Sequence, residues 1–143
     1  MAISNLDDLI DSRAVIARIE ELEDERQALA DASEDEDGLE EDRAEAKANL
    51  AAWDDSDEAY ELLSLKALVS EAEPYCPDWK YGTTLIRDSY FEDYAQELAS
   101  ELYSKAIGDA KWPFDCIDWE KAAEELQQDY TEVEFDGVTY WVR

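Results

Sequence analysis

TEVEFDGVTYWVR, residues 131–143, carries the clearest structural signal in this sequence. Val133 and Phe135 alternate with polar residues ahead of Asp136 and Gly137, and the same alternation resumes after them. Alternation with a period of two predicts β-strands, and an Asp-Gly pair between two such runs favours a type I′ turn. The chain is therefore predicted to close with a β-hairpin.

Two helices are predicted ahead of this hairpin. Asp118 is a typical N-cap residue, and residues 119–126 place their hydrophobic side chains on one face of a helix. An earlier amphipathic helix is expected to begin at Asp88 or Ser89 and to end before Gly108.

The aromatic residues divide the chain at Pro74. Of the sixteen Trp, Tyr and Phe residues, only Trp53 and Tyr60 precede this proline. Proline also ends helices, because it lacks the amide donor and disfavours the helical region before it. Residues 74–143 are therefore predicted to form a small aromatic-cored α+β unit that ends in the β-hairpin, and residues 1–73 to form an acidic helical arm.

Hydrophobic residues at helical spacing predict three helices in the arm. The first begins at a cap residue, Ser12, and its apolar stripe ends at Leu29, ahead of a polar turn at residues 31–38. A second stripe covers residues 39–53, and a third helix is expected near residues 57–72. The spacing of the first stripe does not continue through the turn, which favours a helical hairpin over one long helix. The predicted fold class is mainly α (α+β), with an N-terminal acidic helical hairpin, further helices and a C-terminal β-hairpin.

Composition argues against several classes of protein. The 143 residues include 40 Asp and Glu, 12 Lys and Arg and no histidine, for a formal net charge of −28. Without histidine there is no Ser–His–Asp triad and no His-ligated zinc. So acidic a chain is unsuited to bind nucleic acid or an anionic membrane directly, because phosphate contacts need Lys and Arg. No apolar run approaches the roughly 18 residues of a membrane span.

Cofactors, metals and catalytic residues are not predicted. Cys76 and Cys116 lie forty residues apart, form no CxxC motif and are interpreted as reduced thiols. Residues 35–38, DEDG, resemble the start of a calcium loop, but the ligand spacing and the glutamate at the twelfth position are not met. The N-terminus lacks the basic start of a signal peptide, so a cytoplasmic location, in a bacterial host, is expected.

The surplus of negative charge instead favours mimicry of DNA. Duplex DNA carries one charge per about 1.7 Å of axis, so 28 net charges match roughly 48 Å of duplex. A protein that binds DNA through a basic groove does not readily distinguish such a surface from its substrate. The predicted partner-binding residues are the acids of the arm, namely Glu20, Glu21, Asp24, Glu25, Asp31, Glu34, Asp35, Glu36, Asp37, Glu40, Glu41, Asp42, Glu45, Asp54, Asp55, Asp57, Glu58 and Glu61.

Three alternatives compete with mimicry. The acids are also consistent with the diffuse coat of a halophilic protein. A non-catalytic adaptor or regulator would bind a protein partner through its aromatic second half, with hot spots among Trp79, Trp112, Trp119 and Trp141. A metal-dependent enzyme is the third and weakest alternative.

Two segments of the second half share the layout of a known family. DSYFEDYAQELASELY, residues 88–103, is followed by a spacer and by CIDWEKAAEELQQDYTEVEFDGVTYWVR, residues 116–143. This order resembles the C-terminal part of the ArdA antirestriction family, which has an acidic amphipathic helix, an aromatic-Asp-aromatic-Glu segment that opens the next helix, and a closing strand. Ile117, Asp118, Trp119 and Glu120, with Ala123, stand where the family's segment would be.

The resemblance implies a DNA mimic that binds type I restriction–modification enzymes. The small acidic chain is also similar to other phage anti-defence proteins, including Ocr-like mimics and some anti-CRISPR proteins. The expected partner is thus a DNA-binding protein of a host defence system, either restriction–modification or a CRISPR effector. The apolar helical seams also favour a homodimer, which would lengthen the acidic surface.

Overall fold

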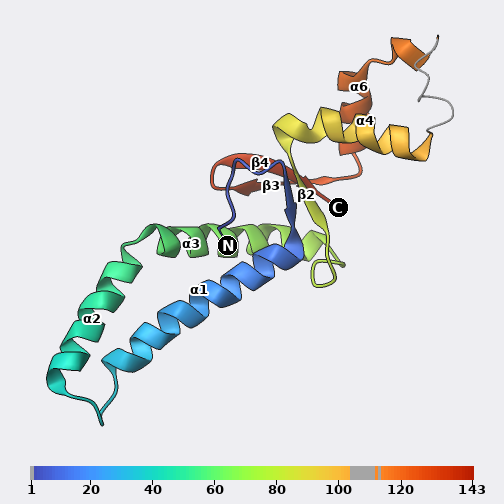
Figure 1. The fold of residues 1–143 in the computed structure, drawn as a ribbon. Helices are drawn as coiled ribbons and strands as arrows, with labels where there is room; N and C mark the ends of the chain where they lie inside the picture. Colours follow the sequence, from blue (N-terminus) through green and yellow to red (C-terminus); the bar gives the residue numbers. More distant parts are fainter. Residues whose placement is uncertain (1, 104–111, 113) are drawn as a thin grey trace.

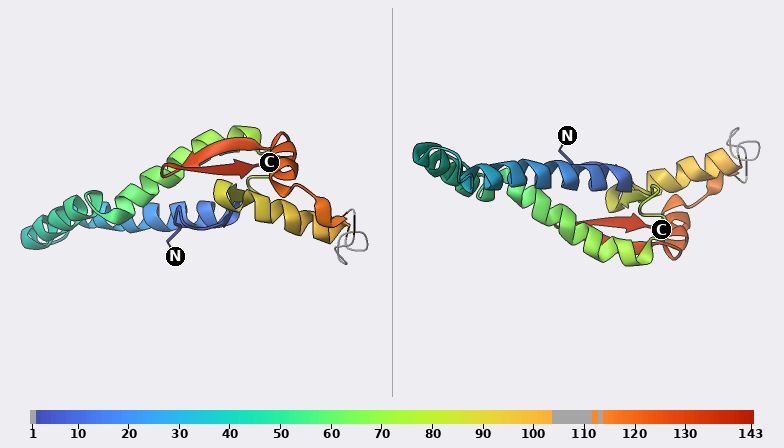
Figure 2. Two further views of the ribbon diagram at one scale, coloured as in Figure 1. Left: turned by 90° about the horizontal axis from the view of Figure 1, so that it is seen from above. Right: turned by 90° about the horizontal axis from the view of Figure 1, so that it is seen from below.

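The computed structural model describes residues 2–103, 112 and 114–143. Within them the fold is mainly α, with one small antiparallel sheet, which confirms the predicted fold class. The molecule is elongated: a helical hairpin projects from one end, the sheet lies in the middle, and two further helices lie at the other end (Figures 1 and 2).

Three consecutive helices form the first half of the chain. They are α1 (Ser12–Ser33), α2 (Glu40–Asp54) and α3 (Asp57–Ala72). α1 and α2 pack as the predicted hairpin, and α3 runs back beneath the sheet (Figure 1). The loop between α1 and α2 starts later than the sequence indicates, because α1 continues to Ser33, whose hydroxyl donates to the carbonyl oxygen of Ala30.

The predicted cap of α1 is wrong by one residue. The N-cap is Asp11, whose side chain accepts a hydrogen bond from the backbone N–H of Arg13. Ser12 is instead fully buried. Its hydroxyl donates to the carbonyl oxygen of Trp79 and accepts from the N–H of Thr83, both at 2.8 Å. This serine therefore joins the start of α1 to the connection that follows α3.

The sheet has four antiparallel strands in the order β1-β2-β4-β3. Their bounds are β1 (Leu9–Asp11), β2 (Thr84–Arg87), β3 (Thr131–Phe135) and β4 (Val138–Val142). β3 and β4 form the predicted C-terminal hairpin. The turn residues Asp136 and Gly137 have φ values of 50° and 78°, as a type I′ turn requires. Sequence patterning did not predict β1, which is only three residues long.

The two faces of the sheet contact different helices. Leu85 of β2 and Tyr140 of β4 face the larger core, which α1 and α3 complete. Ile86 and Trp141 belong to a second cluster with α4 (Phe91–Leu102) and α6 (Trp119–Gln127). The larger core draws side chains from both sides of Pro74, so the arm of residues 1–73 is built onto the unit of residues 74–143 at its base.

Short 3₁₀ turns precede or follow the helices. They are η1 (Glu73–Tyr75), η2 (Asp88–Tyr90) and η3 (Phe114–Cys116). The predicted start at Asp88 or Ser89 falls on η2, and α4 follows directly. Asp118 caps α6 as predicted, because its side chain accepts a hydrogen bond from the N–H of Lys121 at 3.2 Å. Gly108, the expected end of the earlier helix, lies outside the described residues.

Candidate functional site

The negative charge is concentrated on the projecting hairpin. We define the acidic hairpin as residues 20–58, which cover the outer part of α1, all of α2 and the start of α3. This segment has 18 acidic and 3 basic residues, a net charge of −15, whereas the other 104 residues carry the remaining −13. The charge per residue is thus about threefold higher on the hairpin.

All but one of the predicted partner-binding residues lie on the acidic hairpin, and each of these is exposed. The exception is Glu61, on α3. Its side chain is 14% exposed, and both carboxylate oxygens are used inside the protein. Glu61 therefore differs from the other predicted residues, because its carboxylate is mostly buried and contacts Arg18 and Ile3.

A bidentate ion pair between Arg18 and Glu61 joins α1 to α3. Arg18 Nε lies 2.8 Å from Glu61 Oε2, and Arg18 Nη2 lies 2.9 Å from Oε1. The backbone N–H of Ile3 also donates to Oε2, at 3.2 Å. The hydrogen bonds from Arg18 hold the pKa of Glu61 below its usual value, against the opposing effect of burial.

Two more arginines hold the outer part of the hairpin. Arg26 of α1 binds Asp54 at the end of α2, with Nε–Oδ1 and Nη2–Oδ2 distances of 2.8 and 3.1 Å. This pair lowers the pKa of Asp54. Arg43 of α2 reaches the tip, where its Nη1 donates to the carbonyl oxygens of Asp35, Glu36 and Gly38.

The positions of these arginines in the sequence could have indicated that they form contacts within the fold. Arg26 and Arg43 occupy positions in the apolar stripes of their helices, where a hydrophobic residue is expected. Arginine at such a position buries its aliphatic stem and directs its guanidinium to a partner within the fold. Three of the six cations of the arm, Arg18, Arg26 and Arg43, thus form contacts between its segments.

The charge density of the two hairpin helices is more than half that of duplex DNA. The 15 residues of α2 extend about 22 Å, and the outer part of α1 has nearly the same length. Duplex DNA of that length carries about 13 charges. Residues 20–33 and 40–54 carry a net charge of −8 over this length, and the loop and the start of α3 add the remaining −7 of the acidic hairpin.

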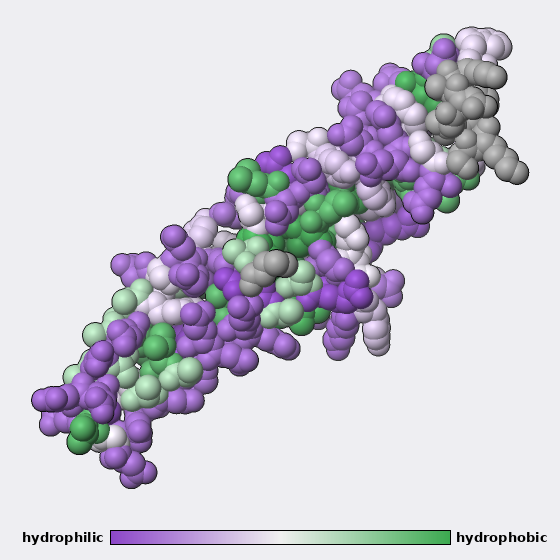
Figure 3. Space-filling model, viewed as in Figure 1, coloured by the Kyte–Doolittle hydropathy of each residue, from purple (hydrophilic) through white to green (hydrophobic). Residues whose placement is uncertain are grey.

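Acidic residues continue at a lower density toward the opposite end. Exposed acids on α4 and α6 include Glu92, Glu101, Glu124 and Glu125. Figure 3 shows hydrophilic residues along the whole visible face, with apolar residues gathered mainly at the centre. The acids do not coat a sphere, because the molecule is elongated and its hairpin projects from the core (Figure 2).

The tryptophans proposed as hot spots for an adaptor are mostly not available. Trp79 is 2% exposed and belongs to the larger core. Trp119 and Trp141 are half-buried, and the indole N–H of Trp141 donates to Asp88. Trp112 is exposed. The four residues therefore do not form one aromatic surface for a partner.

Other classes of site find little support in the described residues. In that part of the chain no group of three or more His, Cys, Asp or Glu side chains is placed to hold a metal ion. Both cysteines are free thiols, Cys76 buried and Cys116 exposed. None of the described helices combines the length and the apolar character that crossing a membrane requires.

Comparison with protein-family models, curated proteins and solved structures finds no match to this chain. The molecule is therefore defined by its own features, as an elongated α+β protein with an acidic helical hairpin. The similarity of residues 88–143 to the ArdA layout stays a prediction based on the residues quoted for it.

Proposed function

We propose that this protein is a DNA mimic that occupies the DNA-binding groove of a bacterial defence enzyme, of the antirestriction or anti-CRISPR type. The observation that supports this function best is the acidic hairpin, which holds a net charge of −15 on two packed helices, the loop that joins them and the start of α3. The protein acts by occupancy, without a cofactor or a catalytic residue. Its partner is a DNA-binding protein rather than nucleic acid.

A mimic gains from carboxylates that are fixed before binding. Arg26 and Arg43 each hold one part of the hairpin, and Arg18 joins α1 to α3 beside it, so the surrounding acids project from an ordered scaffold. Preorganised charges need little ordering when the partner arrives, which favours affinity. A concentrated field also raises the association rate with a basic groove, and this gain falls as ionic strength rises.

A phage-plating assay tests the function in cells. The chain is expressed in bacteria that carry a type I restriction–modification system, and a matched strain carries a CRISPR effector directed at the phage. We expect unmodified phage to plate at least tenfold more efficiently in one of these strains when the protein is present. Plating that is unchanged in both would contradict the proposed function for these two enzyme classes.

Two charge variants with equal net charge identify the surface responsible. The hairpin variant neutralises six exposed acids to their amides, and the control neutralises six exposed acids near α4 and α6. The hairpin set is Glu20, Asp24, Glu25, Glu34, Glu36 and Glu45, and the control set is Glu92, Glu101, Glu124, Glu125, Asp129 and Glu132. Only the hairpin variant should lose protection. Equal losses would indicate a general effect of charge.

Competition with DNA tests the mechanism in solution. With the purified defence enzyme that the plating assay identifies, excess duplex DNA should displace the protein, and the apparent affinity should fall steeply between 50 and 200 mM salt. An adaptor that binds through aromatic side chains predicts simultaneous binding with DNA and a weak salt dependence. The two functions therefore give opposite results.

A further inference from the structure

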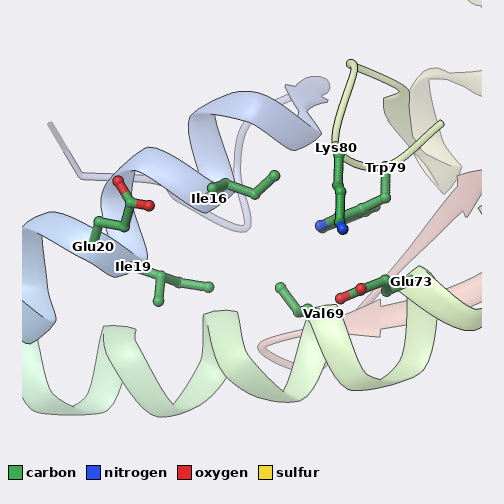
Figure 4. A pocket seen from close by; sticks show the side chains of 7 residues that line it. All are labelled: Ile16, Ile19, Glu20, Val69, Glu73, Trp79 and Lys80. Carbon is green, nitrogen blue, oxygen red and sulfur yellow. The ribbon is translucent and has the colours of Figure 1, made fainter.

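A hollow opens between α1, α3 and the connection that follows η1. Its volume is about 480 Å³, and Figure 4 shows the apolar side chains from the two helices facing the same space. The lining residues are Ile16, Ile19, Glu20, Val69, Glu73, Trp79 and Lys80. Three aliphatic side chains thus form its inner part, and charged groups lie around it.

One wall of the hollow carries a polar group without a partner. Trp79 is 2% exposed, and its indole Nε1 has no hydrogen-bond acceptor among the described residues. The indole N–H is a donor only, and its nitrogen is shielded from solvent. Leaving such a buried donor unpaired is unfavourable. Figure 4 shows the indole of Trp79 and the side chain of Lys80 on the side of the hollow nearest the connection.

The hollow adjoins the acidic hairpin. Glu20 lines the hollow and is also the first residue of the hairpin. Asp24 and Asp31 lie four and eleven residues further along α1, a spacing that keeps them on the same face of the helix. A partner that lies along this face of α1 therefore reaches the hollow where the acidic hairpin begins, at Glu20.

We propose that the hollow receives one aliphatic side chain from the basic partner protein, and this inference rests on the proposed function. The carboxylates of Glu20 and Glu73 outnumber the ammonium of Lys80, so the occupant is flanked by Lys or Arg. The inserted side chain contacts the wall of the hollow to which Trp79 belongs. The insertion adds an apolar anchor to an interface that is otherwise held by charge.

Model peptides test the hollow without the partner. The probes are acetyl-GKKLKKG-amide and acetyl-GKKSKKG-amide, which differ only in the central leucine or serine and carry the same charge. Binding is followed by the indole proton signals in NMR spectra, with the Trp79 signal assigned from Trp79→Phe. We expect the leucine peptide to bind about tenfold more tightly and to shift the Trp79 signal. Equal affinities, or a Trp79 signal that does not move, would overturn the proposal.

A pocket-filling variant keeps the test independent of charge. Val69→Phe fills the hollow, whereas the control Leu63→Phe enlarges an exposed side chain of the same helix outside it. Val69→Phe should reduce the preference for leucine to within about twofold, and Leu63→Phe should preserve it. Retention of the preference in Val69→Phe would overturn the proposal. So would a dimer of the free protein that Val69→Phe dissociates, because a second copy would then be the occupant.

The two proposals fail in different ways. If the wild-type protein gives no protection against either defence system, the proposed function fails, whatever the peptides do. If the wild-type protein protects and Val69→Phe protects equally well, the proposed DNA-mimic function is retained. The proposal that the hollow receives a partner side chain is then overturned. We expect Val69→Phe to reduce protection only partially. The loss should be smaller than in the variant that neutralises six acids of the acidic hairpin.

Discussion

Replacing Arg18 by methionine removes the ion pair that joins α1 to α3 beside the acidic hairpin. Methionine keeps an apolar stem but leaves the Glu61 carboxylate with the N–H of Ile3 as its remaining contact in the described structure. The side chains of Arg18 and Glu61 are 12% and 14% exposed, so water replaces the lost contacts poorly. Net contributions of about 1.5–3 kcal/mol are typical for a hydrogen bond to a charged group. We expect Arg18→Met to lower the free energy of unfolding by about 3 kcal/mol.

A double-mutant cycle isolates the pair itself. Arg18→Met, Glu61→Gln and the double variant are unfolded in urea and followed by circular dichroism at 222 nm. We expect a coupling free energy of about 2 kcal/mol. The Arg26–Asp54 pair supplies a matched control. Its contact is also bidentate, but both side chains are nearly half exposed. Solvent screening should leave the coupling of this second pair close to the experimental error.

The pH dependence gives the cycle a second readout. Hydrogen bonds from Arg18 lower the pKa of Glu61 from its usual value of 4.5. A lowered folded-state pKa contributes stability that is complete above the unfolded value and is lost as the pH falls through the folded value. The Arg18–Glu61 coupling should therefore persist at pH 7 and decline below about pH 4. Burial is expected to make the Arg18–Glu61 pair more stabilising than the exposed Arg26–Asp54 pair. Equal coupling free energies in the two pairs would refute this expectation, and so would an Arg18–Glu61 coupling that is unchanged at pH 3.

Three further predictions concern the base of the arm and the sheet. Gly82→Ala should lower the free energy of unfolding by about 2 kcal/mol or more, because φ at this position is +116° and an added Cβ would lie 2.7 Å from Nε of Arg13. Ser12→Ala should lower it by about 1–3 kcal/mol, because two backbone groups lose their shared hydroxyl partner. Burial raises the pKa of Tyr94 and Tyr140 to about 12. A raised folded-state pKa contributes stability below the unfolded value near 10 that is lost as the pH rises toward 12, so alkaline unfolding should accompany tyrosinate absorbance in that window.

Each of these predictions has a control within the chain. Gly38→Ala has no positive φ to strain and meets only the flexible side chain and the backbone of Asp35, so its effect should be clearly smaller than that of Gly82→Ala. Ser70→Ala changes an exposed serine on α3 and should leave stability nearly unchanged. Replacing the exposed Tyr81 by phenylalanine should leave the alkaline unfolding unchanged. Effects of the same size in the controls would contradict the stated causes.

Local patterning predicted the elements whose cause is local. The Asp-Gly pair at 136–137 requires positive φ values that few other residues accept, so the C-terminal hairpin was readable from the sequence. The start of α3 at Asp57 follows from the cap at Ser56, whose hydroxyl accepts from the N–H of Ala59.

Elements with a long-range cause were not readable in this way. β1 has only three residues, and its pairing with β2 depends on a strand more than seventy residues away. Ser12 has the composition of a helix cap, but its hydroxyl binds the connection near Trp79, so tertiary contacts decide its role. The hollow beside Trp79 likewise depends on the approach of α1 to α3, which hydrophobic spacing alone does not specify.

The predicted surface follows the same division between local and long-range causes. Charge and exposure are nearly local properties, because a run of Asp and Glu along a helix seldom finds enough partners to be buried. The acids of the arm are therefore exposed as the sequence indicates, with the exception of Glu61. That exception depends on Arg18, 43 residues earlier in the chain, whose position opposite Glu61 is fixed only when α1 packs on α3.

The placement of the arginines favours a mimic over a protective coat. A coat that maintains solubility needs charge everywhere and has no need of a stiff projection. Here 39 of the 143 residues hold more than half of the net charge. Arg26 and Arg43 form contacts within that segment, and Arg18 binds Glu61 just outside it. Carboxylates held close together repel one another in the free protein. At low salt, the variant with six hairpin acids neutralised should therefore gain more stability than the control with six acids near α4 and α6 neutralised. A surface whose neutralisation stabilises the fold and abolishes partner binding would be one organised for binding.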